Sequence, residues 1–485
     1  MMQNTCDILV ANAAGVMIPK VGIVQTNIMI ENGKIKALTK STQSVQASRK
    51  INAEGKYVLP GIIDPHVHYG VYTPIEEAAR TESRSAALGG VTTMMRMLRM
   101  NERYGNIEKH LQASQCTHHV DYSIHASILR PNQINDIQYL KKKFGINSFK
   151  IYANLGQDVN HILMDLEPGT HEVVEGEVNI TDQIISDIIQ EASMTHSIVL
   201  VHAEDPVICS RLQKQKQIES ELTGTRITSL RVWSGCRPPS SEANTIVKVG
   251  AYAREFGSTI YFVHIGSGTA LDSILAEKEK GNSNLYIETC PHYLTHTSDF
   301  LDVTGKVVPP LRTKIDVQSM WFALMNGIID TVGSDHVANR LLIKKGQGDI
   351  WSARAGFPGI ATLLPVMLSK GVNEGRISLE RVAEVTSYNA ARIFGLYPKK
   401  GTIEIGSDAD VTIIDLDLLQ KVTPEILQSY SDYSIYEGWE LQGWPLFTIV
   451  RGRVIMENGQ VDKTTCGYGE FVRTAAVAKS YVDSS

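Results

Sequence analysis

Four histidines and one aspartate follow apolar runs in the middle of the chain. They stand in the segments DPHVH, VLVHAE, YFVHIG and VGSDH, and are His66, His68, His202, His264 and Asp335. One histidine after an apolar run is more often a hydrogen-bonded structural residue, and one aspartate there is most often a cap or turn residue. Together, however, imidazole and carboxylate are the ligand types that suit Zn²⁺, Co²⁺, Ni²⁺ or Mn²⁺. The repeated pattern therefore predicts a metal site.

The first two histidines make the strongest part of this pattern. His66 and His68 are separated by one residue. Residues i and i+2 lie on the same face of a strand, so both imidazoles can reach one ion. We therefore expect this pair to bind a single metal.

A lysine lies within another strand-like segment, SFKIYANLG. Phe149 and Ile151 alternate with Lys150, which places the lysine on the opposite strand face. If the two apolar residues pack outward against helices, Lys150 faces the histidines, where nearby divalent cations would repel a protonated ammonium. Three alternatives stay open from the residues alone. The amine is neutral because burial lowers its pKa, or it reacts with CO2 to give a carbamate that bridges two metals, or it reaches water from an edge strand.

The elements that must position these residues are apolar, strand-like runs that alternate with helical segments. Eight such runs extend from YVLPGIIDPHVH at residue 57 to DTVGSDHV at residue 330. Thr181 and Ser241 are expected as helix N-caps, and Gly257 as a C-terminal stop. Eight strands, each followed by a helix-sized connection, predict a parallel (β/α)8 barrel. Polar residues at the carboxyl ends of its strands would point into the active-site mouth.

Both ends of the chain have a different pattern, in which short strands are joined by Gly and Asn turns. We expect residues 1–56 and 400–470 to form the two parts of one small β-domain. The barrel would then occupy residues 57–399, and residues 471–485 would form a C-terminal tail.

Composition and charge exclude several classes of protein. The chain has 485 residues, a net charge of −5 and 43% hydrophobic residues, which is an ordinary soluble composition. The mild acidity gives no reason to expect a nucleic acid or membrane partner, and no apolar run of about 18 residues exists. The six cysteines are scattered without a CxxC pair, and the first residues lack a secretory signal pattern. These features predict a cytoplasmic protein with reduced thiols.

A larger set of motifs resembles the cyclic amidohydrolases of the amidohydrolase superfamily, which are the dihydropyrimidinases, hydantoinases and allantoinases. The motifs are GIIDPHVH, SFK, VHAE, FVHIGS, ETCPHYL, PPLR, GSDH, GFPG and NAARIFGLYPKKGTIEIGSDADVTIID. The resemblance extends from about residue 7 to about residue 470. It implies an α/β fold: a distorted (β/α)8 TIM barrel with a small β-sandwich domain formed by both chain ends. It also implies a homo-oligomer, either a tetramer or a dimer.

The resemblance further implies a binuclear metal centre, with zinc as the first choice and cobalt or manganese as alternatives. The first metal would be held by His66, His68 and Asp335, the second by His202 and His264, and both by Lys150 carbamylated by CO2. Asp335 would be the catalytic residue that moves a proton from the attacking water to the departing nitrogen. The implied activity is hydrolysis of a carbon–nitrogen bond, other than a peptide bond, in a small molecule. A cyclic amide such as a hydantoin or dihydropyrimidine is the default substrate.

Two positions depart from the pattern of hydantoinases and dihydropyrimidinases. Those enzymes have a tyrosine five residues after the bridging lysine, where this chain has Leu155. They also have an asparagine just before GLPG, where this chain has Ala355 in RAGFPG. Neither side chain can donate a hydrogen bond to a ring, and losing such a bond costs about 1–3 kcal/mol. The metal ligands therefore match the family, whereas the substrate contacts differ.

Other polar residues are candidates for the missing substrate contacts. Tyr152 and Asn154 share the strand face of Lys150, and Thr289 lies in ETCPHYL. Because Leu155 and Ala355 make the site more apolar, an alternative is the same chemistry on a less polar or acyclic amide, urea, carbamate or thiocarbamate. A remote alternative is a non-catalytic, dihydropyrimidinase-like assembly protein. Such relatives have typically lost metal ligands, whereas this chain keeps all six positions.

Overall fold

A curled sheet of nine parallel strands forms the centre of the computed structural model, which describes residues 5–474. Its order is β17-β16-β15-β14-β11-β10-β9-β8-β18. The strands are β8 (Ile62–His68), β9 (Val91–Leu98), β10 (Asp121–Ser127), β11 (Ser148–Tyr152), β14 (Ile198–His202), β15 (Thr259–Phe262), β16 (Leu285–Thr289), β17 (Thr331–Val332) and β18 (His336–Val337). The edge strands β17 and β18 are consecutive pieces of one segment, which pair with β16 and β8 respectively. The predicted distorted (β/α)8 barrel is thereby confirmed.

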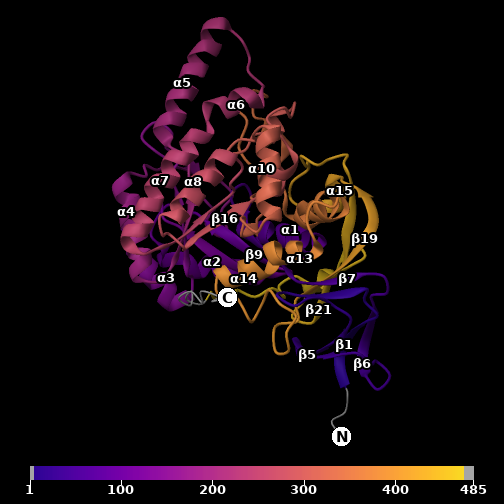
Figure 1. Ribbon diagram of the computed structural model, residues 1–485. Coiled ribbons are helices and arrows are strands. Elements are labelled where there is room, and N and C mark those ends of the chain that lie inside the picture. Colours follow the sequence, from indigo (N-terminus) through magenta and orange to yellow (C-terminus); the bar gives the residue numbers. More distant parts are fainter. Residues whose placement is uncertain (1–4, 475–485) are drawn as a thin grey trace.

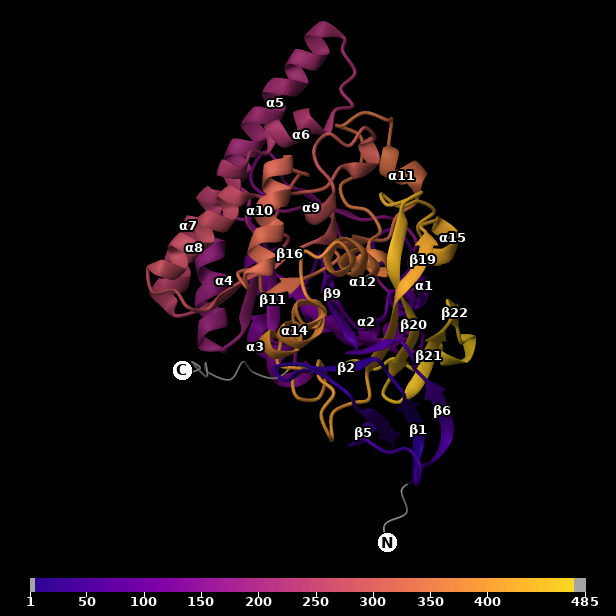
Figure 2. The same ribbon diagram turned by 45° about the vertical axis from the view of Figure 1, so that its right-hand side comes forward.

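Helices follow the strands and cover the outside of the sheet (Figure 1). The long ones are α1 (Ile75–Leu88), α2 (Ile107–Gln115), α3 (Asp136–Phe144), α4 (Asp182–Met194), α5 (Pro206–Thr223), α7 (Pro239–Phe256), α8 (Gly268–Glu279) and α10 (Lys314–Met325). Shorter ones are α6 (Leu230–Cys236), α9 (Pro291–Thr295), α11 (Leu341–Lys345), α12 (Leu363–Val366), α13 (Leu379–Ala383), α14 (Asn389–Ile393) and α15 (Pro424–Leu427). In Figures 1 and 2 the far end of α5 extends away from the barrel. Within the described residues, no helix is long and apolar enough to cross a membrane.

Two of the three expected helix boundaries are confirmed. Thr181 caps α4 by accepting a hydrogen bond from the Ile184 amide, and Gly257 ends α7 in a left-handed conformation with φ 65°. The expectation for Ser241 is wrong, because α7 already begins at Pro239 and Ser241 is buried within it. Proline is favoured in the first helical turn, since the amide it lacks would have no partner there.

Strand parity directs the lysine of β11 inward. Phe149 and Ile151 belong to the same buried cluster as Ile137 of α3 and Ile188 of α4, so they pack outward against helices. Successive strand residues point to opposite faces, so Lys150 points into the barrel. The parity that the sequence analysis assumed is therefore the observed one.

Strands from both chain ends form two further sheets, which lie side by side in both views (Figures 1 and 2). One has the order β5-β4-β1-β6, and the other the order β22-β21-β20-β19-β7-β2-β3. The first chain end supplies β1 (Thr5–Ala11), β2 (Gly15–Ile18), β3 (Gly22–Val24), β4 (Asn27–Glu31), β5 (Lys34–Thr39), β6 (Gln46–Asn52) and β7 (Tyr57–Pro60). The second supplies β19 (Val411–Lys421), β20 (Glu440–Val450), β21 (Arg453–Glu457) and β22 (Gln460–Val461). One buried apolar cluster lies between the sheets, as expected for a sandwich built from both ends. It includes Ile8, Ile28, Val58, Val411 and Ile449.

Two expected boundaries differ in detail. Residues 57–60, assigned to the barrel above, form β7, which pairs with β19 and β2 of the terminal sheet. We therefore propose that the barrel unit begins at residue 61. At the other end, the Val472 amide donates to the Tyr122 carbonyl (2.7 Å), so the first part of the expected tail packs against the barrel. Residues 475–485 of that tail lie outside the described residues.

Candidate metal centre and active site

The predicted metal ligands gather at the carboxyl ends of the barrel strands. His66 and His68 end β8, and His202 ends β14. His264 follows β15, and Asp335 lies between β17 and β18. All five side chains are buried and, together with Lys150, they line one cavity of about 330 Å³.

Three potential ligand atoms converge at one point of this cavity. The Nε2 atoms of His66 and His68 lie 3.2 Å apart, and Asp335 Oδ1 lies 3.2 Å and 3.3 Å from them. Asp335 has a φ of 49°, a left-handed conformation that is rare outside glycine and concentrates at functional sites. Two imidazole nitrogens that face one carboxylate oxygen at these distances form the donor set of a divalent metal.

A second pair of histidines adjoins the first group. The ring centroids of His202 and His264 are 4.6 Å apart, and those of His264 and His66 are 5.4 Å apart. His264 Nδ1 is buried and, within residues 5–474, has no hydrogen-bond partner. Burial lowers the pKa of both imidazoles, which favours the neutral form that binds metals. The sequence-predicted second pair is therefore brought next to the first.

Lys150 lies beside these histidines and is fully buried. Its Nζ atom has no hydrogen-bond partner among the described residues. Burial lowers the pKa of this amine to about 7, although Glu288 and Asp335 oppose that shift. An edge-strand lysine that reaches water is thus excluded, and the neutral amine and the carbamate remain.

Glu288, at the carboxyl end of β16, fixes two histidines of the site. Its Oε1 atom accepts a hydrogen bond from His66 Nδ1 (2.7 Å) and another from the backbone amide of His264 (2.9 Å). Its Oε2 atom accepts one from the Tyr261 hydroxyl (2.8 Å). A carboxylate on Nδ1 leaves Nε2 of His66 as the free lone pair that faces the cavity. The sequence analysis missed this role, although the glutamate stands in the motif ETCPHYL.

Glu204 orients His202 from the other side. Its Oε2 atom lies 2.6 Å from His202 Nε2, so Nδ1 is the nitrogen left for a metal. Arg237 donates two hydrogen bonds to Glu204, of 3.0 Å and 2.7 Å. Burial by itself raises the pKa of Glu204, but Arg237 and His202 outweigh it and bring that pKa to about 2. Glu204 stands two residues after His202 in VHAE. Its position against His202 depends on Arg237, which is distant in the sequence and was not predictable from the motif.

The predicted substrate residues have two outcomes. Tyr152, Asn154, Leu155 and Ala355 line the cavity. Thr289 does not line it, and its buried hydroxyl instead donates to the backbone carbonyl of Ile265 (2.7 Å). That hydroxyl thus links β16 to the segment after β15, and the substrate contact expected of Thr289 stays a prediction.

The site fits a metal centre by its own chemistry. It contains three converging ligand atoms, a second pair of neutral imidazoles with one nitrogen each left free, and carboxylates that fix the rings from behind. Buried polar atoms normally have partners, and those of His264 and Lys150 have none among residues 5–474. Bound cations and their ligands would satisfy these atoms.

Comparisons with known proteins agree with this site. The model of the "Amidohydrolase family" matches residues 57–455. An L-hydantoinase of Paenarthrobacter aurescens is 33% identical over 476 residues, which are 96% of this chain and 98% of that protein. A D-hydantoinase of Ralstonia pickettii is 31% identical, over 93% of this chain and 96% of its own. The crystal structure of a dihydropyrimidinase from Brevibacillus agri superimposes with a TM-score of 0.86 at 26% identity, over 97% of this chain and 99% of that one. The chain therefore belongs to the amidohydrolase family, as a hydantoinase-like hydrolase of carbon–nitrogen bonds other than peptide bonds.

Proposed function

We propose that the protein is a binuclear-metal-dependent hydrolase of cyclic amides, with a hydantoin or dihydropyrimidine ring as the default substrate. The observation that carries this proposal is the convergence of His66, His68 and Asp335 beside the buried Lys150 amine. The relatives named above, a pair of hydantoinases and a dihydropyrimidinase, support the ring substrate. Zinc is the proposed metal, with cobalt or manganese as alternatives.

The geometry supports the following proposed ligands. The first metal is assigned to His66, His68 and Asp335, the second to His202 and His264, and a bridge to Lys150. When bound there, two divalent ions supply a water of lowered pKa and polarise the substrate carbonyl. Glu288 and Glu204 hold the imidazoles in the tautomers that leave one nitrogen free for a metal.

Lys150 is proposed to act as a carbamate formed with CO2. An ammonium would be repelled by two divalent cations, whereas a carbamate is anionic and offers two oxygens. The fully buried position and the absence of another partner for Nζ, among the described residues, support this assignment. The carbamate would also account for a lysine within a strand that is otherwise buried on both faces.

Asp335 is proposed as the proton carrier. Its Oδ1 atom lies 3.2 Å and 3.3 Å from the Nε2 atoms of His66 and His68, at the position assigned to the first metal. It would accept a proton from the attacking water and return it to the ring nitrogen. The return is required because an amide anion is too poor a leaving group to depart without a proton.

Two residues are proposed to contact the ring in place of the family's tyrosine and asparagine. Burial raises the pKa of Tyr152 to about 12, so its hydroxyl stays protonated as a donor. Asn154 Oδ1 is buried and, among the described residues, has no hydrogen-bond partner. Both side chains line the cavity and are free to turn toward a ring amide.

A second candidate function keeps the chemistry but changes the substrate to a less polar or acyclic amide, urea, carbamate or thiocarbamate. It is favoured by Leu155 and Ala355, which place apolar surface where related enzymes have donors. The assembly-protein alternative is not retained, because all six proposed ligand residues line one cavity.

A dimer or tetramer and a cytoplasmic location complete the proposal. All six cysteines are free thiols, which is typical of a reducing compartment. Sedimentation of the purified chain would report the number of copies in the assembly.

The test is turnover of matched substrates by zinc-loaded protein. Hydantoin and dihydrouracil should be opened, with kcat/KM at least about tenfold above that of acyclic ureas and carbamates. A chelator should abolish turnover, and added zinc should restore it. Turnover of acyclic compounds alone would overturn the ring-opening proposal in favour of the second candidate.

A further inference from the structure

The walls of the metal-site cavity carry more cationic than anionic side chains. Apart from Lys150 of the proposed metal centre, the described residues that line it include the basic side chains Arg99, Arg237, Lys306 and Arg354, whereas Asp335 is the one carboxylate. Low-dielectric walls of one charge sign concentrate the field inside a cavity. The cavity is therefore suited to a ligand with negative charge, provided that some of these cations are not already neutralised.

Two of the four cations are already satisfied within the wall. Arg237 forms two hydrogen bonds with the buried Glu204. Lys306 donates to the backbone carbonyls of Ile350 and Ala353, both at 2.6 Å. These side chains hold the wall together and are not free for a ligand.

Arg354 lies at the outer rim of the cavity. Its side chain is 48% exposed and its Nη1 atom is 3.8 Å from Glu175 Oε1, whose side chain is equally exposed. Such a surface pair is screened by water and salt, so it adds little to selection of a ligand.

Arg99 differs from the other three because, among the described residues, its side chain has neither a carboxylate of its own, as Arg237 and Arg354 have, nor the backbone carbonyls that hold Lys306. It follows the carboxyl end of β9, and its side chain is 12% exposed. Asp165 Oδ1 lies 3.8 Å from Arg99 Nη2, but Asp165 Oδ2 also lies 3.3 Å from Nη2 of Arg96, which is almost fully buried. Two buried guanidinium groups thus share one carboxylate. The Nε atom of Arg99 is buried and, within residues 5–474, has no hydrogen-bond partner.

The surplus charge lies close to the proposed metal ligands. Arg99 lines the same cavity as His68 and Asp335. The charges of Arg99 and Arg354 also act on the Tyr72 hydroxyl, where they oppose the effect of burial. Arg99 is therefore part of the cavity that the proposed substrate would occupy.

A buried guanidinium with an unused donor is costly unless a ligand completes it. A carboxylate matches the planar guanidinium with paired, charge-assisted hydrogen bonds, which a neutral ring cannot offer. Leu155 and Ala355 add apolar surface to the same cavity, and their side chains offer no hydrogen-bond donor to a ring.

We propose that the substrate is a cyclic amide or ureide with a carboxylate side chain, and that Arg99 binds this carboxylate. The inference rests on the proposed ring-opening function and adds the substrate class to it. A hydantoin with a carboxymethyl group is the simplest example. Hydrolysis adds the hydroxyl of water to the ring carbonyl carbon and a hydrogen to the departing nitrogen. The product is N-carbamoylaspartate, with a second carboxylate.

The test compares an acid with its uncharged analogue of the same size. Zinc-loaded wild type should open 5-carboxymethylhydantoin with kcat/KM at least about tenfold above that of the matching carboxamide. Arg99→Met should lower kcat/KM for the acid about 10- to 100-fold, mainly through KM, and change that for the carboxamide less than about threefold. Arg99→Lys should fall between, because it keeps the charge and loses the planar fork. The control is Arg376→Met, at a residue 42% exposed and paired with Glu374.

A binding measurement gives a readout independent of turnover. Calorimetry with chelator-treated protein should detect N-carbamoylaspartate binding at least about tenfold tighter than N-carbamoylasparagine. That difference should disappear in Arg99→Met and persist in Arg376→Met. If Arg99→Met does not fold, Arg99→Lys should still show a smaller difference than wild type, and an unchanged difference in that variant would contradict the proposal.

The outcomes separate the two proposals. If zinc-loaded wild type opens neither ring compound, the proposed function fails, and the binding measurement still decides the role of Arg99. If wild type opens both at equal kcat/KM, or Arg99→Met keeps the preference for the acid, the carboxylate proposal is overturned while ring opening stands.

Discussion

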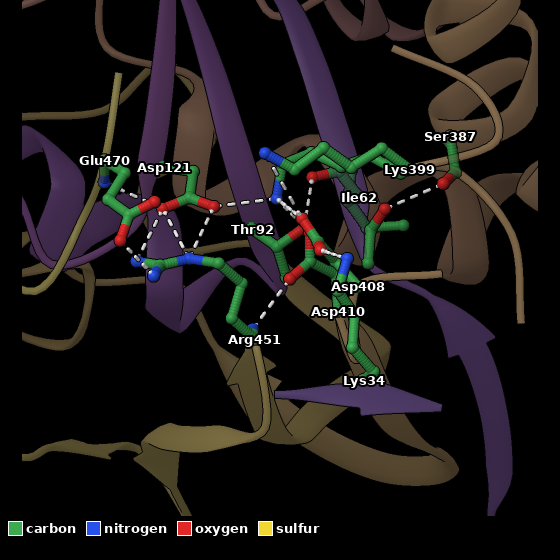
Figure 3. Close-up of polar contacts among 12 residues, drawn as sticks. Lys34, Ile62, Thr92, Asp121, Ser387, Lys399, Asp408, Asp410, Arg451 and Glu470 are labelled. Atoms are coloured by element: carbon green, nitrogen blue, oxygen red, sulfur yellow. Dashed lines mark hydrogen bonds and ion pairs between the residues drawn. The ribbon is translucent and has the colours of Figure 1, made fainter. Parts of the chain in front are cut away.

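Residues 5–474 hold two buried groups of potential metal ligands, at opposite ends of the barrel. One consists of His66, His68 and Asp335 at the carboxyl ends of the strands. The other consists of Asp121, Asp408 and Asp410, where β10 begins beside the terminal sheet (Figure 3). Ligand type and burial alone would assign a cation to both. What differs is the lysine that accompanies each group.

The acidic group already contains its cation. Lys400 Nζ lies 2.7 Å from Asp121, 3.2 Å from Asp408 and 2.5 Å from Asp410. Burial by itself lowers the pKa of Lys400, but the three carboxylates outweigh it and raise that pKa above its usual value. Arg451 adds a second cation to Asp121, as Figure 3 shows. We therefore interpret this group as a structural ion cluster that joins the barrel to the terminal sheet.

Lys150 is the opposite case. It is equally buried, but its Nζ atom has no hydrogen-bond partner in residues 5–474, and burial lowers its pKa to about 7. The Lys400 ammonium is neutralised by its carboxylate partners, whereas the Lys150 amine has no partner among the described residues and is available to react or to bind a metal. The comparison predicts opposite results for matched substitutions at the two sites.

The largest effect on activity is expected from a substitution of Asp335, the proposed proton carrier at the metal centre. Asp335→Asn should lower kcat about 10²–10⁴-fold, because an amide cannot accept and return the proton. Steady-state kinetics on a ring substrate measures this, and Asp417→Asn, at an exposed position, is the control. A kcat within threefold of wild type would contradict the assigned role.

At the structural cluster, Lys400→Met should lower the free energy of unfolding by about 3–5 kcal/mol, because three buried carboxylates lose their shared cation. Denaturant unfolding measures this. The neighbouring Lys399→Met should lower the free energy of unfolding by less than about 1 kcal/mol. The Lys399 side chain is 51% exposed, and its distance of 3.9 Å to Asp408 makes the ion pair weak. Equal losses of unfolding free energy in Lys400→Met and Lys399→Met would contradict the interpretation of the acidic group as a structural ion cluster.

A substitution of Glu204, which orients the proposed metal ligand His202, should have a smaller effect. Glu204→Gln should weaken metal binding about 10- to 100-fold, because His202 loses the carboxylate that fixes its tautomer. Competition with a chelator measures the affinity, and Glu221→Gln on the surface of α5 is the control. Unchanged affinity would show that Glu204 serves only Arg237.

The smallest effect is expected for Lys150→Met in chelator-treated protein at pH 7, where the unfolding free energy should stay within about 1.5 kcal/mol of wild type. The difference between the two proteins changes with pH. The pKa is about 7 when folded and 10.5 by the usual reference, so between these values the unfolded chain binds more protons. Wild type should therefore gain stability relative to the variant as pH rises from 7 to 10. A loss across that range would contradict the buried, unpaired amine.

The sequence predicts much of this arrangement because its signals are local. Strand ends and side-chain parity place His66, His68 and Lys150 correctly, because alternation along a strand holds whatever packs around it. Contacts set by distant residues were not predictable. Asp121 and Lys400 are 279 residues apart and meet only in the folded chain. The hydrogen bond from the Thr289 hydroxyl to the Ile265 carbonyl was likewise not predictable from its position in the motif.

The cation surplus around Arg99 was missed for the same reason. Its significance depends on Asp165 being shared with Arg96, which is a property of packing and not of spacing. The start of α7 was also mispredicted. Ser241 is a residue type that often caps helices, but the helix begins earlier, at Pro239, with Pro238 as its N-cap.

The most direct test of the account is metal content and lysine mass in the same preparation. Wild type purified with zinc and bicarbonate should contain two metal ions per chain, and native mass spectrometry should place one added CO2 on Lys150. Lys150→Ala should contain at most one metal ion and no added CO2. Two metal ions retained in Lys150→Ala, or none bound by wild type, would contradict the proposed centre.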